Sequence, residues 1–94
     1  MTQYRVFLSE SAFRDINDAV TYIADVLMEP LTAKSLLDRL LGAINGLADS
    51  PYRYKAVDQI VQTAFPVHLC TEGNYLIFFS INDAVRCVDV VRVL

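Results

Sequence analysis

The apolar residues of the first 50 positions change from an alternating pattern to a helical one. In "QYRVFL", Gln3 to Leu8, the residues Tyr4, Val6 and Leu8 alternate with Gln3 and Arg5, which predicts a first strand. From Ser9 onward the apolar residues recur at intervals of three and four, which predicts an amphipathic helix. Pro30 is expected to end this helix, because a proline disfavours helical geometry at the residue before it. The apolar stripe comprises Ala12, Phe13, Ile16, Ala19, Val20, Ile23, Val26 and Leu27.

A second helix is expected to begin at Thr32, whose hydroxyl can cap it, and to stop at Asp49-Ser50-Pro51. Its apolar face comprises Leu36, Leu37, Leu40, Leu41, Ile44 and Leu47. Two amphipathic helices with so short a connector are predicted to pack antiparallel as a hairpin. Each helix still has an apolar stripe, so the hairpin needs a sheet to cover.

The second half of the chain favours strands, after a stretch from Tyr52 to Phe65 that has no clean period and is expected to be a surface loop. The strand-like segments are Val67–Thr71, Asn74–Ile81 and Val85–Leu94, and the gaps between them suit hairpin turns. "YLIFF" is apolar on both faces and should be the central strand. The predicted fold class is α+β, in the order β-α-α-β-β-β, with a helical hairpin packed on an antiparallel sheet. A chain of 94 residues forms one domain, over residues 1–94.

The composition indicates a surface that another protein covers. Hydrophobic residues make up 54% of the chain and charged residues 20%, against averages of about 45–50% and about 25%. A small domain cannot bury that much apolar surface alone, so we expect a protein partner or a homodimer. The net charge is −3 and the pI is about 4.8, which disfavours non-specific binding to nucleic acid.

The residues present exclude several classes of site. No apolar run reaches the ~18–20 residues of a membrane-spanning helix, and the N-terminus has no secretory leader, so we expect a cytoplasmic protein without a membrane partner. Cys70 and Cys87 are isolated and cannot complete a four-ligand zinc site with the single histidine. Motifs for nucleotide binding, serine hydrolysis and zinc proteolysis are missing. We therefore expect no metal and no cofactor.

Two pairs of side chains could carry chemistry, but neither is a convincing catalytic site. Cys70 and His68 share a strand face, yet no third group orients them as a nucleophile and its base. Asp15 and Asp18 lie one helical turn apart, among acidic neighbours that are typical of a solvated face. We expect no catalytic residue.

The arginines of the predicted strands leave two interpretations open. Arg86 and Arg92 are six residues apart on the last strand, so we expect them on one face, together with Val88 and Val90. They could form salt bridges and cover the sheet with their aliphatic stems, or they could contact a target. Arg5 on the first strand has the same two interpretations.

Four segments together resemble the RelE/ParE superfamily of toxins. "LSESAFRDINDAVTYIADVL" is similar to the first helix of that superfamily, and "LLDRLLGAINGLADSP" to the second helix with its closing proline. "GNYLIFFSIND" resembles an N-Y-x-I-F-Y-x-[VI] strand, and "VDVVRVL" a V-x-V-x-R-V-L strand. The resemblance covers essentially the whole chain in the same order of elements. It implies a toxin of a type II toxin–antitoxin module, whose surface a cognate antitoxin wraps and neutralises.

The resemblance implies one of two activities, inhibition of DNA gyrase or ribosome-dependent cleavage of mRNA. Ribonuclease members carry basic residues before and beside their conserved tyrosine, which stabilise the charged transition state. Here the corresponding positions are apolar: Val67, Leu69 and Leu76, beside Tyr75. With the low pI, this departure favours the ParE-like, gyrase-inhibiting branch. His68 stands where many relatives have arginine, so its contact should be weaker or pH-dependent.

A further departure lies at the end of the chain. Relatives usually continue past R-V-L into a short tail of the kind Y-G-R-R-D, which contributes to activity in both branches, whereas this sequence ends at Leu94. Three hypotheses therefore stay open: a gyrase inhibitor, which we favour, an mRNA endonuclease acting on the ribosome, and a non-toxic homologue that acts only as an interaction module. In each, the residues expected to contact a target or partner are His68, Tyr75, Arg86 and Arg92.

Overall fold

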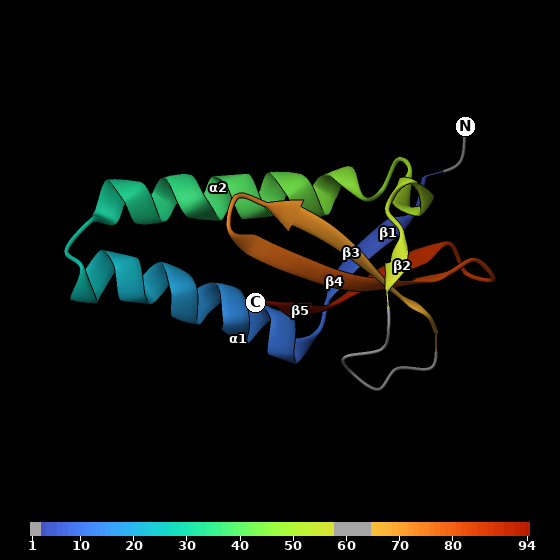
Figure 1. Ribbon diagram of the computed structural model, residues 1–94, viewed down its shortest axis with the longest axis horizontal. Helices are drawn as coiled ribbons and strands as arrows, with labels where there is room; N and C mark the ends of the chain where they lie inside the picture. Colours follow the sequence, from blue (N-terminus) through green and yellow to red (C-terminus); the bar gives the residue numbers. More distant parts are fainter. Residues whose placement is uncertain (1–2, 58–64) are drawn as a thin grey trace.

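Two long helices pack against a single sheet in the computed structural model, which describes residues 3–57 and 65–94 (Figure 1). The elements are β1 (Arg5–Leu8), α1 (Glu10–Thr21), the π-helical turn η1 (Tyr22–Val26), α2 (Pro30–Gly46), the 3-10 turn η2 (Pro51–Arg53), β2 (Ala56–Val57), β3 (Val67–Glu72), β4 (Tyr75–Asn82) and β5 (Cys87–Val93). Part of the loop expected from Tyr52 to Phe65 instead forms η2 and the edge strand β2. Residues 58–64 of that loop lie outside the described residues.

The five strands form one mixed sheet in the order β1-β5-β4-β3-β2. β3, β4 and β5 make the expected antiparallel meander, and β4 lies at the centre. β1 joins the sheet parallel to β5, with Val6 opposite Val88 and Leu8 opposite Val90. The α+β class with a helical hairpin is confirmed, but the sheet is mixed rather than wholly antiparallel. Parallel pairing is open to β1 because the intervening helices and strands supply the long connection that it needs.

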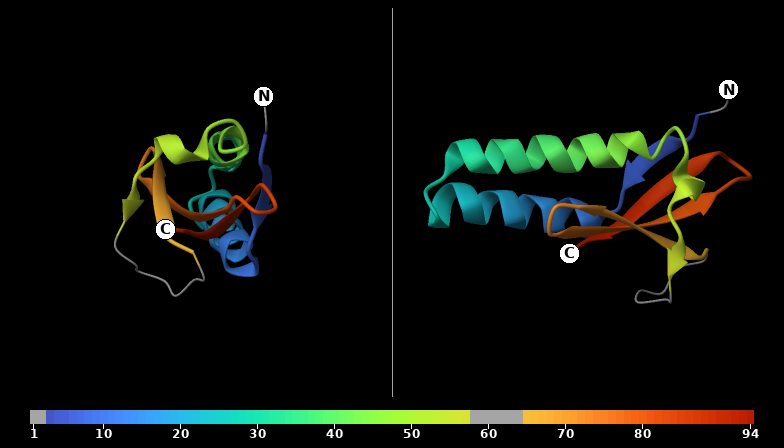
Figure 2. Two further views of the ribbon diagram at one scale, coloured as in Figure 1. Left: turned by 90° about the vertical axis from the view of Figure 1, so that its right-hand side faces the viewer. Right: turned by 45° about the horizontal axis from the view of Figure 1, so that its top comes forward.

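The core lies between the sheet and the inner stripes of α1 and α2, which run side by side (Figure 2). Its members from the helices are Ala12, Ile16, Leu36, Leu40 and Ile44, followed by Leu47 just after α2, and its strand members include Ile77, Phe79, Ile81, Val88, Val90 and Val93. Phe13 and Leu27 were expected in the first helix's stripe, but they are 61% and 51% exposed. Phe13 lies about 100° around the helix from the fully buried Ala12, so it falls outside the inner face.

The first helix is shorter than its pattern predicts. After Thr21 it continues as η1, in which the Leu27 N–H donates to the Tyr22 carbonyl at 3.1 Å, five residues back. This wider turn rotates Leu27 away from the stripe that the 3.6-residue period predicts for it. Met28 then adopts a left-handed φ of 56° and redirects the chain toward α2.

Pro30 begins the second helix, so the prediction that it only ends the first and that Thr32 caps the second is wrong. A proline suits the first helical position, because its fixed φ is helical and the N–H that it lacks would have no partner there. Thr32 lies within the first turn, and its hydroxyl donates to the Glu29 carboxylate at 3.3 Å. The joined ends of α1 and α2 extend beyond the sheet as an arm (Figures 1 and 2).

Candidate functional site

The four residues predicted to contact a target or partner lie at two ends of the sheet. His68 and Arg86 lie toward the β4–β5 turn, whereas Tyr75 and Arg92 lie where β4 begins and β5 ends. The two pairs are therefore separated along the strands. Each residue is held by contacts within the chain, and these contacts determine what it can do.

Arg86 belongs to the β4–β5 turn and not to a strand, because β5 begins at Cys87. It adopts a left-handed φ of 55°, and its N–H donates to the Asp83 carbonyl at 3.3 Å to close the turn. The prediction that Arg86 shares a strand face with Arg92 is wrong, since β4 ends at Asn82 and β5 begins only at Cys87, which leaves Arg86 in the connection between them. The Arg86 carbonyl accepts from Arg5 N–H at 2.9 Å, which ties the turn to β1.

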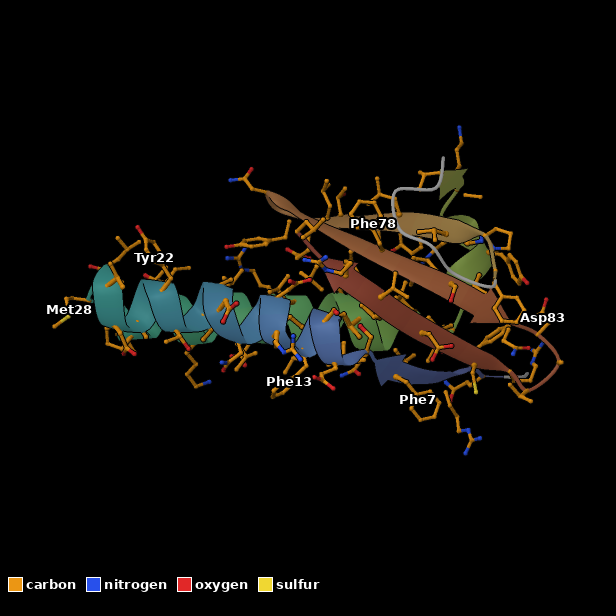
Figure 3. All side chains as sticks on the ribbon, turned by 90° about the horizontal axis from the view of Figure 1, so that it is seen from below. Phe7, Phe13, Tyr22, Met28, Phe78 and Asp83 are labelled. Carbon is orange, nitrogen blue, oxygen red and sulfur yellow. The ribbon has the colours of Figure 1, made fainter. Side chains whose placement is uncertain are left out.

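Asp83 is the centre of a polar cluster at this end of the molecule (Figure 3). Its two carboxylate oxygens accept from the hydroxyls of Tyr4, at 2.5 Å, and of Tyr52. The Arg86 guanidinium lies 3.7 Å from the carboxylate, donates to the Tyr4 hydroxyl at 3.2 Å, and lies over the Tyr4 ring at 4.3 Å. The cluster joins the start of β1, the η2 turn and the β4–β5 turn, which are distant in the sequence.

The charge of Asp83 governs the ionisation of this cluster. The hydrogen bonds from Tyr4 and Tyr52, with the nearby Arg86 charge, hold the pKa of the Asp83 carboxyl below its usual value. In return, the hydrogen bond to Asp83 raises the pKa of Tyr4, and raises that of Tyr52 to about 12. At neutral pH the tyrosines are therefore fixed donors to a carboxylate, and neither is poised to act as a general base.

His68 is held by a backbone carbonyl and two aromatic rings. Its Nδ1 lies 2.8 Å from the Tyr54 carbonyl oxygen, and since a carbonyl only accepts, Nδ1 carries the proton and donates. The ring stacks on Phe79 at 5.5 Å and meets the Tyr52 ring edge-on at 5.9 Å. Through Tyr52, His68 is connected to the Asp83 cluster.

Arg92 is bound to α1 at the other end of the sheet. Its Nε and Nη2 donate to the two carboxylate oxygens of Asp15 at 2.7 and 3.0 Å, and the Val93 N–H donates to the same carboxylate at 2.9 Å. Burial alone would raise the pKa of Asp15, but these hydrogen bonds and the Arg92 charge outweigh it and lower that pKa. The hydroxyl of Ser9, the N-cap of α1, donates to the Val91 carbonyl at 2.9 Å. This bond gives a partner to a backbone carbonyl of β5 that lies past the last residue paired with β1.

A bulge in β5 places Arg92 on the face opposite the one predicted. Phe78 pairs with Arg92 but Phe79 pairs with Val90, so Val91 is an extra residue. Val93 consequently returns to the core, where Val88 and Val90 are also buried. The prediction that Arg92 shares a face with Val88 and Val90 is therefore wrong.

Tyr75 is half-buried against the hydrophobic core and pairs with Glu72 across the β3–β4 hairpin. Its neighbour Leu76 exchanges both backbone hydrogen bonds with Leu94, at 2.8 Å each. Beside this end of the sheet, a shallow polar hollow of about 290 Å³ is lined by Ser11, Arg14, Asp15, Asp18 and Arg92. The hollow combines acids with arginines, so it has no strong preference for an anion or a cation.

The prediction of contact residues missed Asp83, Tyr4, Tyr52 and Asp15, each of which holds one of the predicted residues or lies next to it. In the sequence, Asp83 is typical of a turn residue, and Tyr52 lies in the segment without a clean period. Neither has a local sequence signal that predicts its contacts in the cluster. Within residues 3–57 and 65–94, no three histidine, cysteine or acidic side chains are grouped closely enough to hold a metal ion. No helix in the same described ranges is long and apolar enough to cross a membrane.

Comparison with known proteins identifies relatives of both sequence and fold. The family model described as "ParE toxin of type II toxin-antitoxin system, parDE" matches residues 6–94. A structure of the chromosomal ParDE toxin–antitoxin system from P. aeruginosa has a TM-score of 0.75 at 13% identity, covering 96% of this chain and 92% of that one. No curated protein sequence matches.

Two further solved structures share the fold. The toxin–antitoxin complex RelBE2 from Mycobacterium tuberculosis has a TM-score of 0.67 at 20% identity, covering 100% of this chain and 92% of that one. The archaeal RelE–RelB complex from Pyrococcus horikoshii OT3 has a TM-score of 0.62 at 14% identity, covering 99% and 93%. At these identities the structural likeness establishes the fold alone.

Proposed function

Because the chain belongs to the ParE toxin family of type II toxin–antitoxin systems, we propose that it inhibits DNA gyrase by binding it, without catalysing a reaction. In this proposal the protein acts in the cytoplasm, where gyrase works on DNA, and a cognate antitoxin neutralises it. The observation that carries the proposal is that both candidate arginines, Arg86 and Arg92, are already paired with carboxylates.

Cleavage of RNA would require positive charge that is free to stabilise a phosphorane-like transition state. Arg92 instead forms a bidentate ion pair with Asp15, and Arg86 contacts Asp83 and Tyr4. Beside Tyr75 the chain places Leu76, and Leu69 lies on the neighbouring strand. This arrangement supports a binding function more than a ribonuclease function, as does the net charge of −3.

Exposed apolar side chains support the antitoxin as a partner. Phe7 and Leu8 on β1 and Phe13 on α1 are all exposed, although each is a large hydrophobic residue. Exposed apolar groups of this kind mark protein interaction sites. The solved structures that share the fold include the RelBE2 and RelE–RelB toxin–antitoxin complexes. We therefore expect an antitoxin segment to cover this side of the molecule.

The experiment is induction of the chain in bacterial cells, with and without its cognate antitoxin. We expect growth arrest without the antitoxin, loss of negative supercoiling in a reporter plasmid, and rescue when the antitoxin is produced. Transcripts mapped by primer extension should remain intact. Codon-phased cuts in mRNA would instead indicate the ribosome-dependent endonuclease, and unaffected growth at full expression would indicate a non-toxic interaction module.

A further inference from the structure

The end of the helical arm carries a group of apolar side chains that the domain does not bury. We call these residues the arm tip; their exposed fractions lie between 51% and 83%. They are Tyr22, Val26, Leu27, Met28 and Leu31. Met28 marks the end of the molecule opposite the Asp83 cluster, and Tyr22 lies next to that end (Figure 3). The arm extends past the sheet, so the arm tip is accessible from several sides (Figures 1 and 2).

The backbone at the arm tip is irregular in a way that keeps these side chains outside. The π-helical turn η1 bonds Leu27 to Tyr22, and the Glu29 N–H then donates to the Ile23 carbonyl at 3.0 Å. Met28 adopts a left-handed φ of 56°, a conformation that favours glycine or asparagine over a long side chain. Irregular turns of this type concentrate at functional sites.

The charged residues nearest the arm tip along the chain are mainly acidic. Asp18, Asp25 and Glu29 lie in the segment from residue 15 to residue 33, which contains no lysine, arginine or histidine. The next base along the chain, Lys34, pairs with Asp38 at 3.1 Å and not with the tip. Among the described residues, Asp25 and Glu29 have no ion-pair partner. The arm tip is thus an apolar surface that carries two acids, Asp25 and Glu29, outside any ion pair of the described residues.

This combination argues against a second copy as the occupant, because two arm tips would place like charges opposite each other in a symmetric dimer. It fits an apolar pocket with a rim of lysine and arginine. A DNA-handling enzyme must present basic surface to the phosphate backbone, so the target of the proposed function offers the matching charge.

We propose that the arm tip is the part of the protein that docks on gyrase, at a basic surface that otherwise contacts DNA. Met28 and Leu31, the two most exposed members, enter an apolar pocket, and Asp25 and Glu29 face the basic residues that would contact phosphates. The inference rests on the proposed function, since it identifies the surface through which gyrase is bound. It predicts that DNA and the arm tip compete for the enzyme.

The test measures binding of the full chain to purified gyrase holoenzyme by surface plasmon resonance. The apolar variant is Met28→Ser with Leu31→Ser, and its control is Leu41→Ser with Val85→Ser, exposed apolar residues elsewhere. The charge variant is Asp25→Lys with Glu29→Lys, and its control is Asp38→Lys with Asp49→Lys, which changes the net charge equally. Circular dichroism checks that each variant is folded.

Both tip variants should bind about tenfold more weakly or worse, as expected for residues at the centre of an interface, and both controls should stay within about twofold. The charge variant should also lose most of the salt dependence of wild-type binding, and duplex DNA should displace the wild type. If the wild type binds gyrase but the tip variants bind it as tightly as their controls do, the inference is overturned and the proposed function stays intact. Loss of antitoxin binding alone in the tip variants would overturn it too. A wild type that does not bind gyrase would refute the proposed function itself.

Discussion

Replacing Asp15 with alanine removes the ion pair that joins α1 to the end of β5. The side chain is only 15% exposed and accepts three hydrogen bonds, two from Arg92 and one from the Val93 N–H. A hydrogen bond to a charged group contributes about 1.5–3 kcal/mol. Because Arg92 is itself partly exposed, its two bonds together count for about 1.5 kcal/mol, and the bond from the Val93 N–H counts for about 1 kcal/mol. Alanine recovers about 0.5 kcal/mol of helix propensity. We expect a net loss of about 2 kcal/mol.

The matched control is Asp18→Ala, one turn further along the same helix, where the carboxylate has no ion pair among the described residues. It gains the same helix propensity and loses little else, so its stability should change by less than about 0.5 kcal/mol. In a domain of this size a loss of about 2 kcal/mol lowers Tm by about 8–16 °C. Urea unfolding followed by circular dichroism gives the free energy, and a thermal scan gives the Tm shift.

The dependence on pH separates the ion pair from a packing effect. The pKa of Asp15 is lowered in the folded state, so its contribution is complete above the unfolded pKa near ~3.9 and is lost as pH falls through the lower folded value. The cost of Asp15→Ala should be constant from pH 7 to pH 5 and should shrink below pH 4. Two results would refute the reasoning. One is that Asp15→Ala loses no more free energy of unfolding at pH 7 than Asp18→Ala does. The other is that Asp15→Ala loses as much at pH 3 as at pH 7.

Three further predictions concern Tyr52, Leu40 and Met28. A pH titration followed by absorbance at 295 nm should show the Tyr52 phenol ionising with a pKa of about 12, and Tyr52→Phe should lack that step. Because folding raises this pKa, the free energy of unfolding should fall as pH rises from 10 to 12. A Tyr52 pKa near 10 would contradict its contact with Asp83. Leu40→Ala should cost about 2–5 kcal/mol in urea unfolding, since Leu40 is fully buried, and a cost below about 1 kcal/mol would show a loose core. Met28→Gly should raise the free energy of unfolding by about 0.5–1 kcal/mol, because glycine adopts the left-handed φ without strain, whereas Met28→Ala should not raise it. Equal stability of the two variants would argue against strain at this position.

The sequence predicts the elements whose signals are local. β4 is recognisable because "YLIFF" is apolar on both faces, which suits only a strand with neighbours on both sides. Gly73 supplies the left-handed φ of 59° that the β3–β4 turn requires. The stripes of α1 and α2 follow the helical period over enough turns to predict a hairpin on a sheet.

Features that depend on tertiary packing have no such signal. The parallel pairing of β1 with β5 joins residues about 80 positions apart, and alternation within β1 is the same for either neighbour. The bulge at Val91 reverses the faces of Arg92 and Val93, whereas strict alternation from Val88 places Arg92 on the face of Val88 and Val90. Pro30 is equally compatible with the end of one helix and the start of the next.

The partners of the candidate residues could not be predicted from the sequence. Arg92 was identified as either a salt bridge or a target contact, and the structure pairs it with Asp15, 77 positions away. Arg86 was identified in the same terms, and its surroundings of Tyr4 and Asp83 form only when β1 lies beside the β4–β5 turn. Pairings of this kind are set by the fold and not by spacing along the chain.

The most direct test of the proposed function is a supercoiling assay with purified gyrase, relaxed plasmid and ATP, titrated with the purified chain. We expect inhibition that increases with the amount of chain and disappears when the cognate antitoxin is added in equimolar amount. The proposed binding mechanism gives Arg92 no catalytic role, so inhibition should persist in Arg92→Gln. Supercoiling that continues unchanged in a large excess of folded protein would contradict the account.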